Sequence, residues 1–276
     1  MKLAILLTAA LLSVAGSASA QDSTVAHPVA DSGSTAAPKA WRTPAANAAF
    51  GKQIERDLAA RGARVAIVFR AGRPRSKLPP GIAYTHAAFF VYGDIKGGDG
   101  HIYQGYSVYN LYQGDGTSLP VNQSYLRQDF PFDFISADAE DDVGIIIPTP
   151  EMQRRLMATI ASPTYEKMHV PSYTLVSNPW DPKHQNCTEF VLDVVASSAW
   201  QTDDYAQVKA DLKAWFKPTV VQANPFERFF GPMLDSRLNL DDQSGDIETA
   251  TYESISAFMA DNHLSETSYV LQRAAN

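Results

Sequence analysis

Apolar residues recur with a helical period in some segments of the chain and form short unbroken runs in others. Phe50, Ile54 and Leu58 stand four residues apart, which predicts a helix over residues 45–61 that ends near Gly62. An apolar run at residues 65–69 has the length of one buried strand. The same criteria predict strands at residues 82–92, 101–112, 143–147 and 173–177, and helices at 150–161, from 187 onward, and at 205–216, 225–234 and 252–262.

A glycine-rich segment, residues 97–100, separates two of these predicted strands. Such a segment is a strong turn signal, so strands 82–92 and 101–112 are expected to pair as an antiparallel hairpin. The order along the chain places strands in the middle and helices around them. This pattern predicts an α+β fold in which an antiparallel sheet packs on helices.

The first twenty residues have the order of a signal peptide. Lys2 precedes an apolar stretch at residues 3–15, and residues 17–20 end in an Ala-x-Ala cleavage pattern. The alternative is an N-terminal membrane anchor, but the stretch is shorter than the roughly 20 residues that a span requires. We therefore expect a periplasmic or secreted protein with no transmembrane segment after cleavage. Its expected parts are a signal peptide (1–20), a disordered lead-in (21–40), a main domain (41–220) and a C-terminal helical extension (221–276).

The charge of the chain argues against one class of partner. The full sequence carries 23 basic and 30 acidic residues, for a net charge of −7. A surface of this sign repels phosphate backbones, so nucleic-acid binding is not expected. The chain also has one cysteine, so an exported protein of this sequence cannot form an internal disulfide.

That cysteine, Cys187, stands at the predicted start of a helix. Asn186 has the character of an N-cap, and Glu189 three residues later completes a capping-box pattern. Phe190 and Val194 then begin the helical apolar period. The free N–H groups and the positive dipole end of a first helical turn favour a thiolate, so Cys187 is a candidate nucleophile.

A cysteine nucleophile needs a base, and histidine is the usual one. His86 interrupts a strand that is otherwise apolar or aromatic, so it is expected to be buried and hydrogen-bonded. His27 falls in the lead-in, His101 follows the glycine turn, and His169 and His263 lie at predicted helix ends. His86 is therefore the candidate base, with a structural role as the alternative.

Two segments carry a family resemblance. The sequence YTHAAFFV at residues 84–91, followed by NCTEF at 186–190, resembles the permuted NlpC-like branch of the papain-like cysteine hydrolases. That branch includes relatives of lecithin–retinol acyltransferase, and its histidine strand precedes its cysteine helix. With YNLYQ at 109–113 and IPTPE at 147–151, the chain is more closely similar to a family of uncharacterised, secreted proteobacterial proteins over roughly residues 60–220. The resemblance implies a permuted papain-like fold, a cysteine nucleophile and a histidine base, but no particular substrate.

The third catalytic residue in this branch usually lies on the strand after the histidine strand, where it orients the imidazole. A three-residue loop at residues 97–99 would place Asn110 opposite His86. A register shift of one residue would turn Asn110 to the other face. Asn110 is therefore the predicted orienting residue, with Gln104 and Gln113 as alternates.

The remaining polar residues near Cys187 are candidates for support. The Cys187 backbone N–H at the helix start would bind an oxyanion, and Gln185 is a candidate second donor. Asn186 and Glu189 are expected to support the site through the cap. No cofactor is expected, because the chain lacks phosphate-loop, dinucleotide, Gly-x-Ser-x-Gly and His-Glu-x-x-His motifs.

Three alternatives remain open at this level. His184 and Cys187 have a spacing that would suit zinc if His86 or His101 joined them. The basic run at residues 70–75 is expected to be a solvated loop, with anion binding as its alternative. The leading hypothesis is a cysteine hydrolase acting on a cell-envelope peptide amide, or second on a lipid ester, and its rival is a non-enzymatic cell-envelope binding module on the same scaffold.

Overall fold

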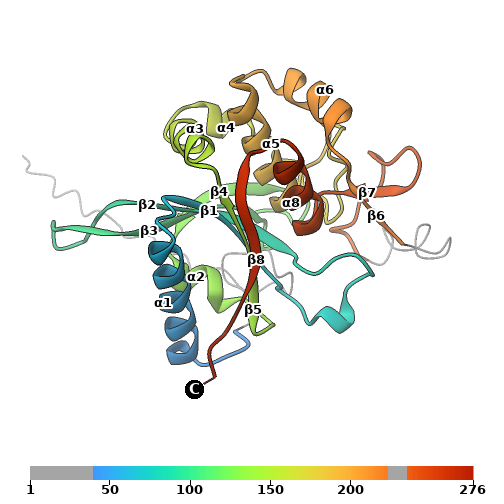
Figure 1. The fold of residues 1–276 in the computed structure, drawn as a ribbon. Helices are drawn as coiled ribbons and strands as arrows, with labels where there is room; N and C mark the ends of the chain where they lie inside the picture. Colours follow the sequence, from blue (N-terminus) through green and yellow to red (C-terminus); the bar gives the residue numbers. More distant parts are fainter. Residues whose placement is uncertain (1–39, 223–234, 276) are drawn as a thin grey trace, which may run out of the picture.

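The computed structural model describes residues 40–222 and 235–275 and has a six-stranded antiparallel sheet at its centre (Figure 1). The strand order is β4-β3-β2-β1-β5-β8, and a separate pair of strands, β6 and β7, lies outside this sheet. The α+β prediction with an antiparallel sheet is confirmed. The strands are β1 (Val65–Arg70), β2 (His86–Lys96), β3 (Ile102–Gln113), β4 (Ser124–Asp129), β5 (Asp142–Pro148), β6 (Thr219–Val221), β7 (Ile247–Thr249) and β8 (Ser265–Gln272).

Helices cover both faces of the sheet and divide the core into two clusters. On one face, apolar residues of α1 and α2 pack on Ala88 and Phe90 of β2. On the other face, residues of α3, α5 and α8 pack on Ala87 and Phe89. The alternation of β2 residues between the clusters is the two-residue period of a strand buried on both sides. The helices are α1 (Pro44–Ala60), α2 (Pro131–Ser136), α3 (Pro150–Ile160), α4 (Thr164–Lys167), α5 (Cys187–Trp200), α6 (Tyr205–Trp215) and α8 (Tyr252–Asp261), with a short 3-10 helix at Arg75–Lys77.

Helix α5 is the central helix of the fold, and nearly all of its residues are buried. It packs against β2 and β3 on one side and against α3 and α6 on the others. A helix that is enclosed by neighbours has no solvent face, which explains why its sequence is apolar all round rather than amphipathic. Packing on β2 and β3 therefore holds α5, which begins at Cys187, against the sheet.

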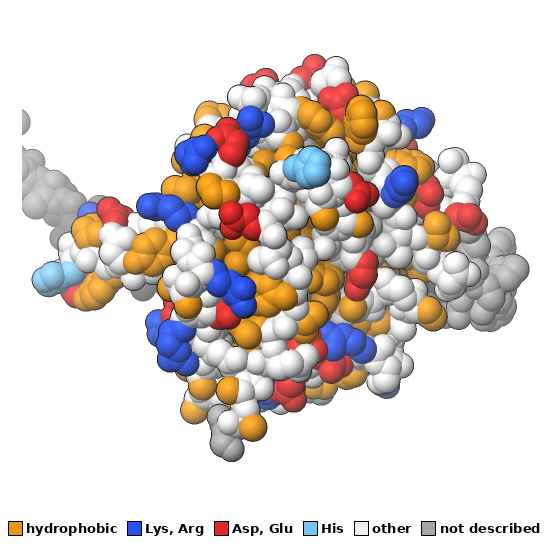
Figure 2. Space-filling view, viewed as in Figure 1, with side chains coloured by type: hydrophobic (Ala, Val, Ile, Leu, Met, Phe, Trp, Pro, Cys, Tyr) orange, Lys and Arg blue, Asp and Glu red, His pale blue; other side chains and the backbone are white. Residues whose placement is uncertain are grey.

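The hairpin of β2 and β3 differs from its predicted register. Its first ladder pair is Lys96 with Ile102, so the loop has two more residues than predicted, and Ala88 rather than His86 lies opposite Asn110. A shift of two residues leaves every side chain on its original face, so Asn110 keeps the face predicted for it. The end of this hairpin projects from the body of the molecule (Figure 1). Ile102, beside its loop, is 58% exposed, and Figure 2 shows apolar side chains on the projecting end.

The C-terminal segment completes the sheet, which corrects the prediction of a helical extension. Strand β8 pairs with β5 from Asp142–Gln272 to Pro148–Ser265, and α8 packs beside it. The predicted helix at 225–234 lies outside the described residues, as do the predicted signal peptide and all but the last residue of the lead-in. Every helix that the structure describes is too short or too polar to span a bilayer.

Strands β4 and β8 were not predicted, and the predicted strand at 173–177 is irregular. Strands β4 and β8 lie at the edges of the central sheet, and solvent reaches several of their residues, so neither carries an apolar run. The three-residue strands β6 and β7 were not predicted either. In the 173–177 segment, Tyr173 makes only an isolated bridge to Gln185. That segment is instead a buried loop that leads towards the start of α5.

Candidate active site

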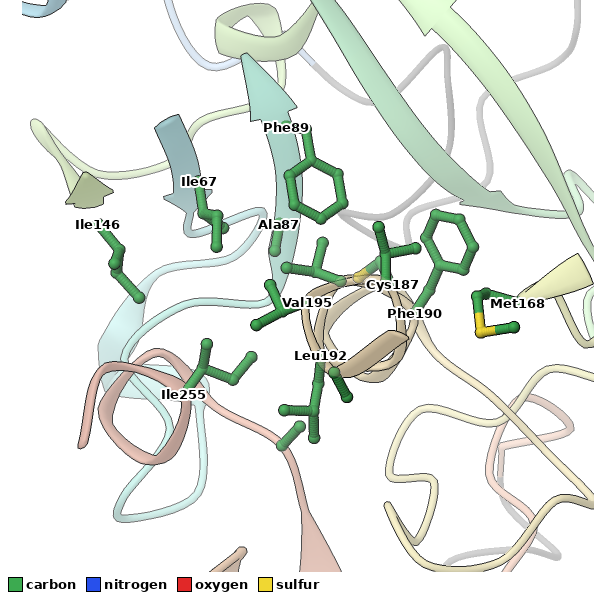
Figure 3. Close-up of a cluster of buried hydrophobic side chains, with 14 of the residues drawn as sticks. Ile67, Ala87, Phe89, Ile146, Met168, Cys187, Phe190, Leu192, Val195 and Ile255 are labelled. Atoms are coloured by element: carbon green, nitrogen blue, oxygen red, sulfur yellow. The ribbon is translucent and has the colours of Figure 1, made fainter. Parts of the chain in front are cut away.

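Cys187 is the first residue of α5, as predicted. The side-chain oxygen of Asn186 accepts hydrogen bonds from the backbone N–H groups of Thr188 (3.1 Å) and Glu189 (2.9 Å), which caps the helix. The thiol donates to the backbone carbonyl of Thr85, with a sulfur–oxygen distance of 3.5 Å. Cys187 is only 2% exposed and lies beside Phe89 and Phe190 (Figure 3).

His86 is the first residue of β2 and is fully buried. Its Nε2 lies 3.1 Å from Oδ1 of Asn110, and its ring stacks on Tyr112 with centroids 5.2 Å apart. Its Nδ1 has no hydrogen-bond partner among the described residues. Because Oδ1 only accepts hydrogen bonds, it selects the tautomer with the proton on Nε2, which leaves a lone pair on Nδ1.

The surroundings of His86 keep its imidazole neutral. Burial holds the pKa of His86 well below its ordinary value, and the nearby positive charge of Arg70 lowers it further. The hydrogen bond that Nε2 donates to Asn110 acts in the opposite direction and is the weakest of the three effects. A neutral imidazole with a free lone pair is the form that can accept a proton.

The sulfur and the imidazole approach the start of β2 from its two faces. Cys187 belongs to the core cluster that contains Ala87, whereas the His86 ring contacts Phe134 of the opposite cluster, with centroids 5.5 Å apart. No hydrogen bond joins the sulfur to the His86 ring, since Nδ1 has no partner and Nε2 is bonded to Asn110. The sulfur instead touches the carbonyl of Thr85, the residue covalently bonded to His86.

Arg70 is a buried cation beside this site, which corrects the expectation that the run at 70–75 is solvated. In the ladder between β1 and β2, Arg70 is the residue opposite His86. Its side chain is buried, with the residue 1% exposed, and Nη1 donates to the carbonyl of Ala137 (3.4 Å). Burial lowers the pKa of Arg70, against the raising effect of Tyr112, Asp138 and Cys187. Because this attraction is mutual, the charge of Arg70 favours a thiolate at Cys187. Sequence analysis missed Arg70 because a cluster of basic residues is usually exposed.

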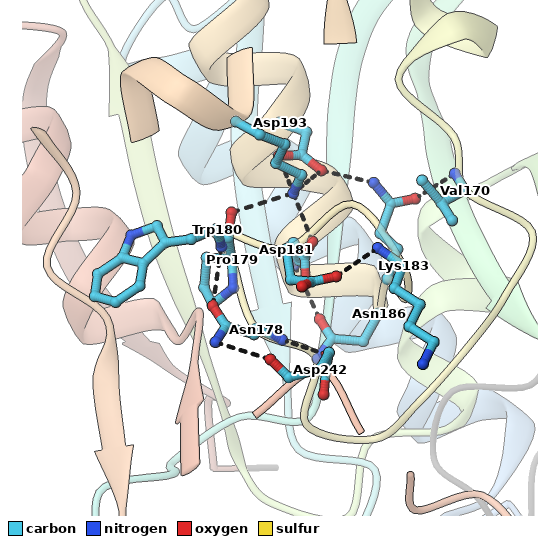
Figure 4. A network of polar contacts seen from close by, with 12 residues as sticks. Val170, Asn178, Pro179, Trp180, Asp181, Lys183, Asn186, Asp193 and Asp242 are labelled. Carbon is cyan, nitrogen blue, oxygen red and sulfur yellow. Dashed lines mark hydrogen bonds and ion pairs between the residues drawn. The ribbon is translucent and has the colours of Figure 1, made fainter. Parts of the chain in front are cut away.

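The side chain of Gln185 is occupied by structural contacts. Its Nε2 donates to the Met168 carbonyl (2.8 Å) and to Asp193 (2.7 Å), and its Oε1 accepts from the N–H of Val170 (2.9 Å) (Figure 4). These bonds tie the loop at 168–170 to α5. Gln185 is fully buried, so its observed role is to hold the segment before Cys187 rather than to present a donor to solvent.

The carboxylate of Glu189 also points away from the cap. It lies 2.6 Å from the ammonium of Lys209, which is bonded as well to both oxygens of Asp193 (2.8 and 2.9 Å). All three groups are buried, and burial raises the pKa of Glu189 to about 8 against the lowering effect of Lys209. One half of the predicted capping box is therefore present, namely the bond from the Glu189 backbone N–H to the Asn186 side chain. The other half is missing, because the Glu189 side chain binds Lys209 and joins α5 to α6.

Other candidates lie away from His86. Gln104 is bonded to Asp94 at the exposed end of the hairpin, and Gln113 donates to the carbonyl of Val121 (2.6 Å). His101 pairs with Asp99 at the hairpin loop. Within the described ranges, no three or more His, Cys, Asp or Glu side chains gather as metal ligands would.

Comparison with known proteins identifies a bacterial family whose description assigns no function. The family model described as "Uncharacterized protein conserved in bacteria (DUF2145)" matches residues 57–259. The chain therefore belongs to this bacterial family, and the match includes Cys187, His86 and Asn110. No curated protein and no solved structure gives a significant match.

Proposed function

We propose that this protein is a secreted cysteine hydrolase in which Cys187 is the nucleophile, His86 the base and Asn110 the orienting residue. The observation that carries the proposal is the hydrogen bonding of the two ring nitrogens of His86. Asn110 bonds its Nε2 at 3.1 Å, and Nδ1 is left without a partner in the described chain. A buried nitrogen without a hydrogen bond costs folding free energy, so this unsatisfied nitrogen, one residue along the chain from the Thr85 carbonyl that holds the Cys187 thiol, favours a functional over a purely structural histidine.

In this proposal the thiol moves from the Thr85 carbonyl towards Nδ1 before reaction. Nδ1 takes the thiol proton, and the sulfur forms a bond to the substrate carbonyl carbon. The bond from that carbon to the leaving amine or alcohol breaks, and the leaving group takes the proton from the imidazolium. Water that the same histidine activates then attacks the thioester carbon, the carbon–sulfur bond breaks, and the acid and the free thiol are released. The backbone N–H of Cys187 and the charge of Arg70 stabilise the negative charge that develops during these steps.

The proposed substrates are amide bonds in cell-envelope peptides, with lipid esters as the second class. This assignment follows from the expected export of the chain and from its resemblance to permuted NlpC-like hydrolases. The acidic net charge of −7 disfavours nucleic acids, and Figure 2 shows acidic and basic side chains interspersed on the visible face.

The proposal can be tested by the rate at which iodoacetamide alkylates Cys187 in the folded protein. Because Cys187 is the only cysteine, all labelling reports on this site. We expect the rate to follow a titration below the ordinary range of a thiol, and to fall in His86→Ala. His101→Ala, an exposed histidine on the hairpin, is the control and should react as the wild type does. The second measurement is release of amines from cell-wall peptides, which Cys187→Ala should abolish.

A binding module is the second candidate, and the burial of Cys187 favours it. The side chain is 2% exposed and packs in an apolar cluster, where a cysteine can serve as a small hydrophobic residue. On this alternative iodoacetamide reacts only after unfolding, and peptide binding persists in Cys187→Ala. Rapid labelling of the folded chain together with loss of hydrolysis in Cys187→Ala would reject the binding module.

A further inference from the structure

A second hydrogen-bonded chain of catalytic residue types lies near the start of α5. His184 Nδ1 is 2.7 Å from the hydroxyl of Ser172, and His184 Nε2 is 2.6 Å from a carboxylate oxygen of Asp241. We propose that Ser172, His184 and Asp241 form a separate nucleophilic site that reacts with activated acyl esters. The proposed function does not use these residues.

Asp241 sets which nitrogen of His184 donates a hydrogen bond and which one accepts. Hydrogen bonds from Lys183 and His184 lower the pKa of Asp241 against the effect of burial, so its carboxylate is ionised and can only accept. With only a lone-pair acceptor beside Nε2, the tautomer of His184 that fits this contact carries its proton on Nε2. Its Nδ1 is then the acceptor, and the hydroxyl of Ser172 donates to it, as a serine beside a general base must.

The exposure of the three side chains suits a reaction with a solute. The His184 side chain is 8% exposed, Asp241 is 47% exposed, and Ser172 is half-buried. The base is thus held in the protein, while Ser172 is only partly covered. Ser172 has no other side-chain hydrogen bond among the described residues, so its hydroxyl is not committed to a second acceptor.

Backbone contacts hold each member of the site in place. The N–H of Gln185, next to His184, donates to the carbonyl of Ser172 (2.9 Å). The carboxylate of Asp242, next to Asp241, accepts from the N–H of Asn178 (2.8 Å), as Figure 4 shows. Fixed neighbours of this kind preserve the geometry that base catalysis requires.

The reaction balances with an ester as the sole co-substrate besides water. The Ser172 oxygen forms a bond to the acyl carbon as its proton passes to His184 Nδ1. The bond from that carbon to the leaving alcohol breaks, and the alcohol takes the proton from His184. Water then releases the acid from Ser172 through the same histidine.

The test uses the full-length chain with Cys187→Ala, so that failure of the cysteine proposal does not affect it. A fluorophosphonate probe should label Ser172 of the folded protein, with one adduct that peptide mapping places at this residue. Labelling and hydrolysis of p-nitrophenyl acetate should fall about 100-fold when His184→Asn removes the base. Ser172→Ala should abolish labelling, and Asp241→Asn should slow it.

The chain offers a matched control in a second serine–histidine pair. The hydroxyl of Ser124 lies 3.0 Å from Nε2 of His169, but no carboxylate is bonded to that histidine among the described residues. Ser124→Ala should leave labelling unchanged. An unlabelled Ser172 in the folded protein, or equal labelling after His184→Asn, would overturn the proposal and leave the three residues as a structural link between loops. Mapping of the adduct needs no substitution at the site, so the outcome does not depend on how His184→Asn folds.

Discussion

Asn110 and His86 form a hydrogen bond across two neighbouring strands although they are two positions out of direct register. Ala88 is the residue opposite Asn110, yet Oδ1 of Asn110 lies 3.1 Å from Nε2 of His86. Diagonal neighbours on one face of an antiparallel pair are within reach of such side chains. The contact sets the tautomer of the ring and leaves Nδ1 buried and without a hydrogen-bond partner in the described chain.

Replacement of Asn110 by aspartate should raise the pKa of His86. A carboxylate at this position accepts the same hydrogen bond and adds a negative charge, which favours the protonated ring. The pKa can be followed by NMR titration of the ring protons. His169, which is not bonded to Asn110, provides an internal control because its own pKa is lowered by burial alone. An unchanged His86 titration would show that the contact does not govern the ring.

Replacement of Asn186 by alanine should both weaken α5 and slow alkylation of Cys187. The substitution removes the acceptor for two backbone N–H groups, which costs about 1 kcal/mol of folding free energy. Thr149→Ala removes the cap of α3, which accepts from one backbone N–H, and should cost no more than Asn186→Ala without affecting Cys187. Denaturant unfolding and iodoacetamide kinetics separate the two effects. Equal alkylation rates in both variants would contradict a role of the cap in thiolate formation.

Replacement of Lys209 by methionine should be one of the most damaging single changes in the fold. It would leave the buried carboxyl groups of Glu189 and Asp193 without their cation, and where they are ionised the cost is about 3–5 kcal/mol. Lys52→Met breaks an exposed pair with Glu55 and should cost less than about 1 kcal/mol. The free energy of unfolding in urea gives both values. A small loss for Lys209→Met would mean that the two carboxyl groups are already protonated in the native protein.

The features that the sequence predicted are those with a local signal. The four-residue spacing of Phe50, Ile54 and Leu58 predicted α1, and the Asn186–Cys187 pair predicted the start of α5 within one residue. Burial of His86 followed from its place in an apolar run. The register of β2 and β3 was wrong by two residues, and Asn110 stayed on the predicted face only because the error was even.

The features that it missed depend on partners far away in the chain. Nothing near Arg70 in sequence shows that it is buried, with His86 of β2 opposite it and the ring of Phe134 of α2 under its guanidinium. The hydrogen bonds that link Ser172, His184 and Asp241 join separate loops. His184 and Asp241 lie 57 residues apart in the sequence, so no spacing rule could indicate their contact. Glu189 was assigned to a cap because its partner, Lys209, lies on the following helix. Polar edge strands such as β8 lack the apolar alternation that sequence patterns detect.

Asp138 should make the protein less stable as the pH rises, and its replacement by asparagine should remove that effect. Burial raises the pKa of Asp138 from 3.8 to about 7, although Arg70, Arg273 and Arg42 act against the shift. Between these pH values the folded protein keeps a proton that the unfolded chain has released. Rising pH therefore favours unfolding over this window.

Asp138→Asn should flatten the fall in unfolding free energy between about pH 4 and pH 7, and the variant should be more stable than wild type at pH 8. Asparagine can still accept the hydrogen bond from the N–H of Glu140. Glu151→Gln is the control of opposite sign, because bonds from Arg155 and Arg154 lower the pKa of Glu151 and its contribution is lost as the pH falls. Urea unfolding at successive pH values measures each slope. If the slope of Asp138→Asn between pH 4 and pH 7 equals that of wild type, Asp138 is ionised in the native protein and the nearby arginines outweigh its burial.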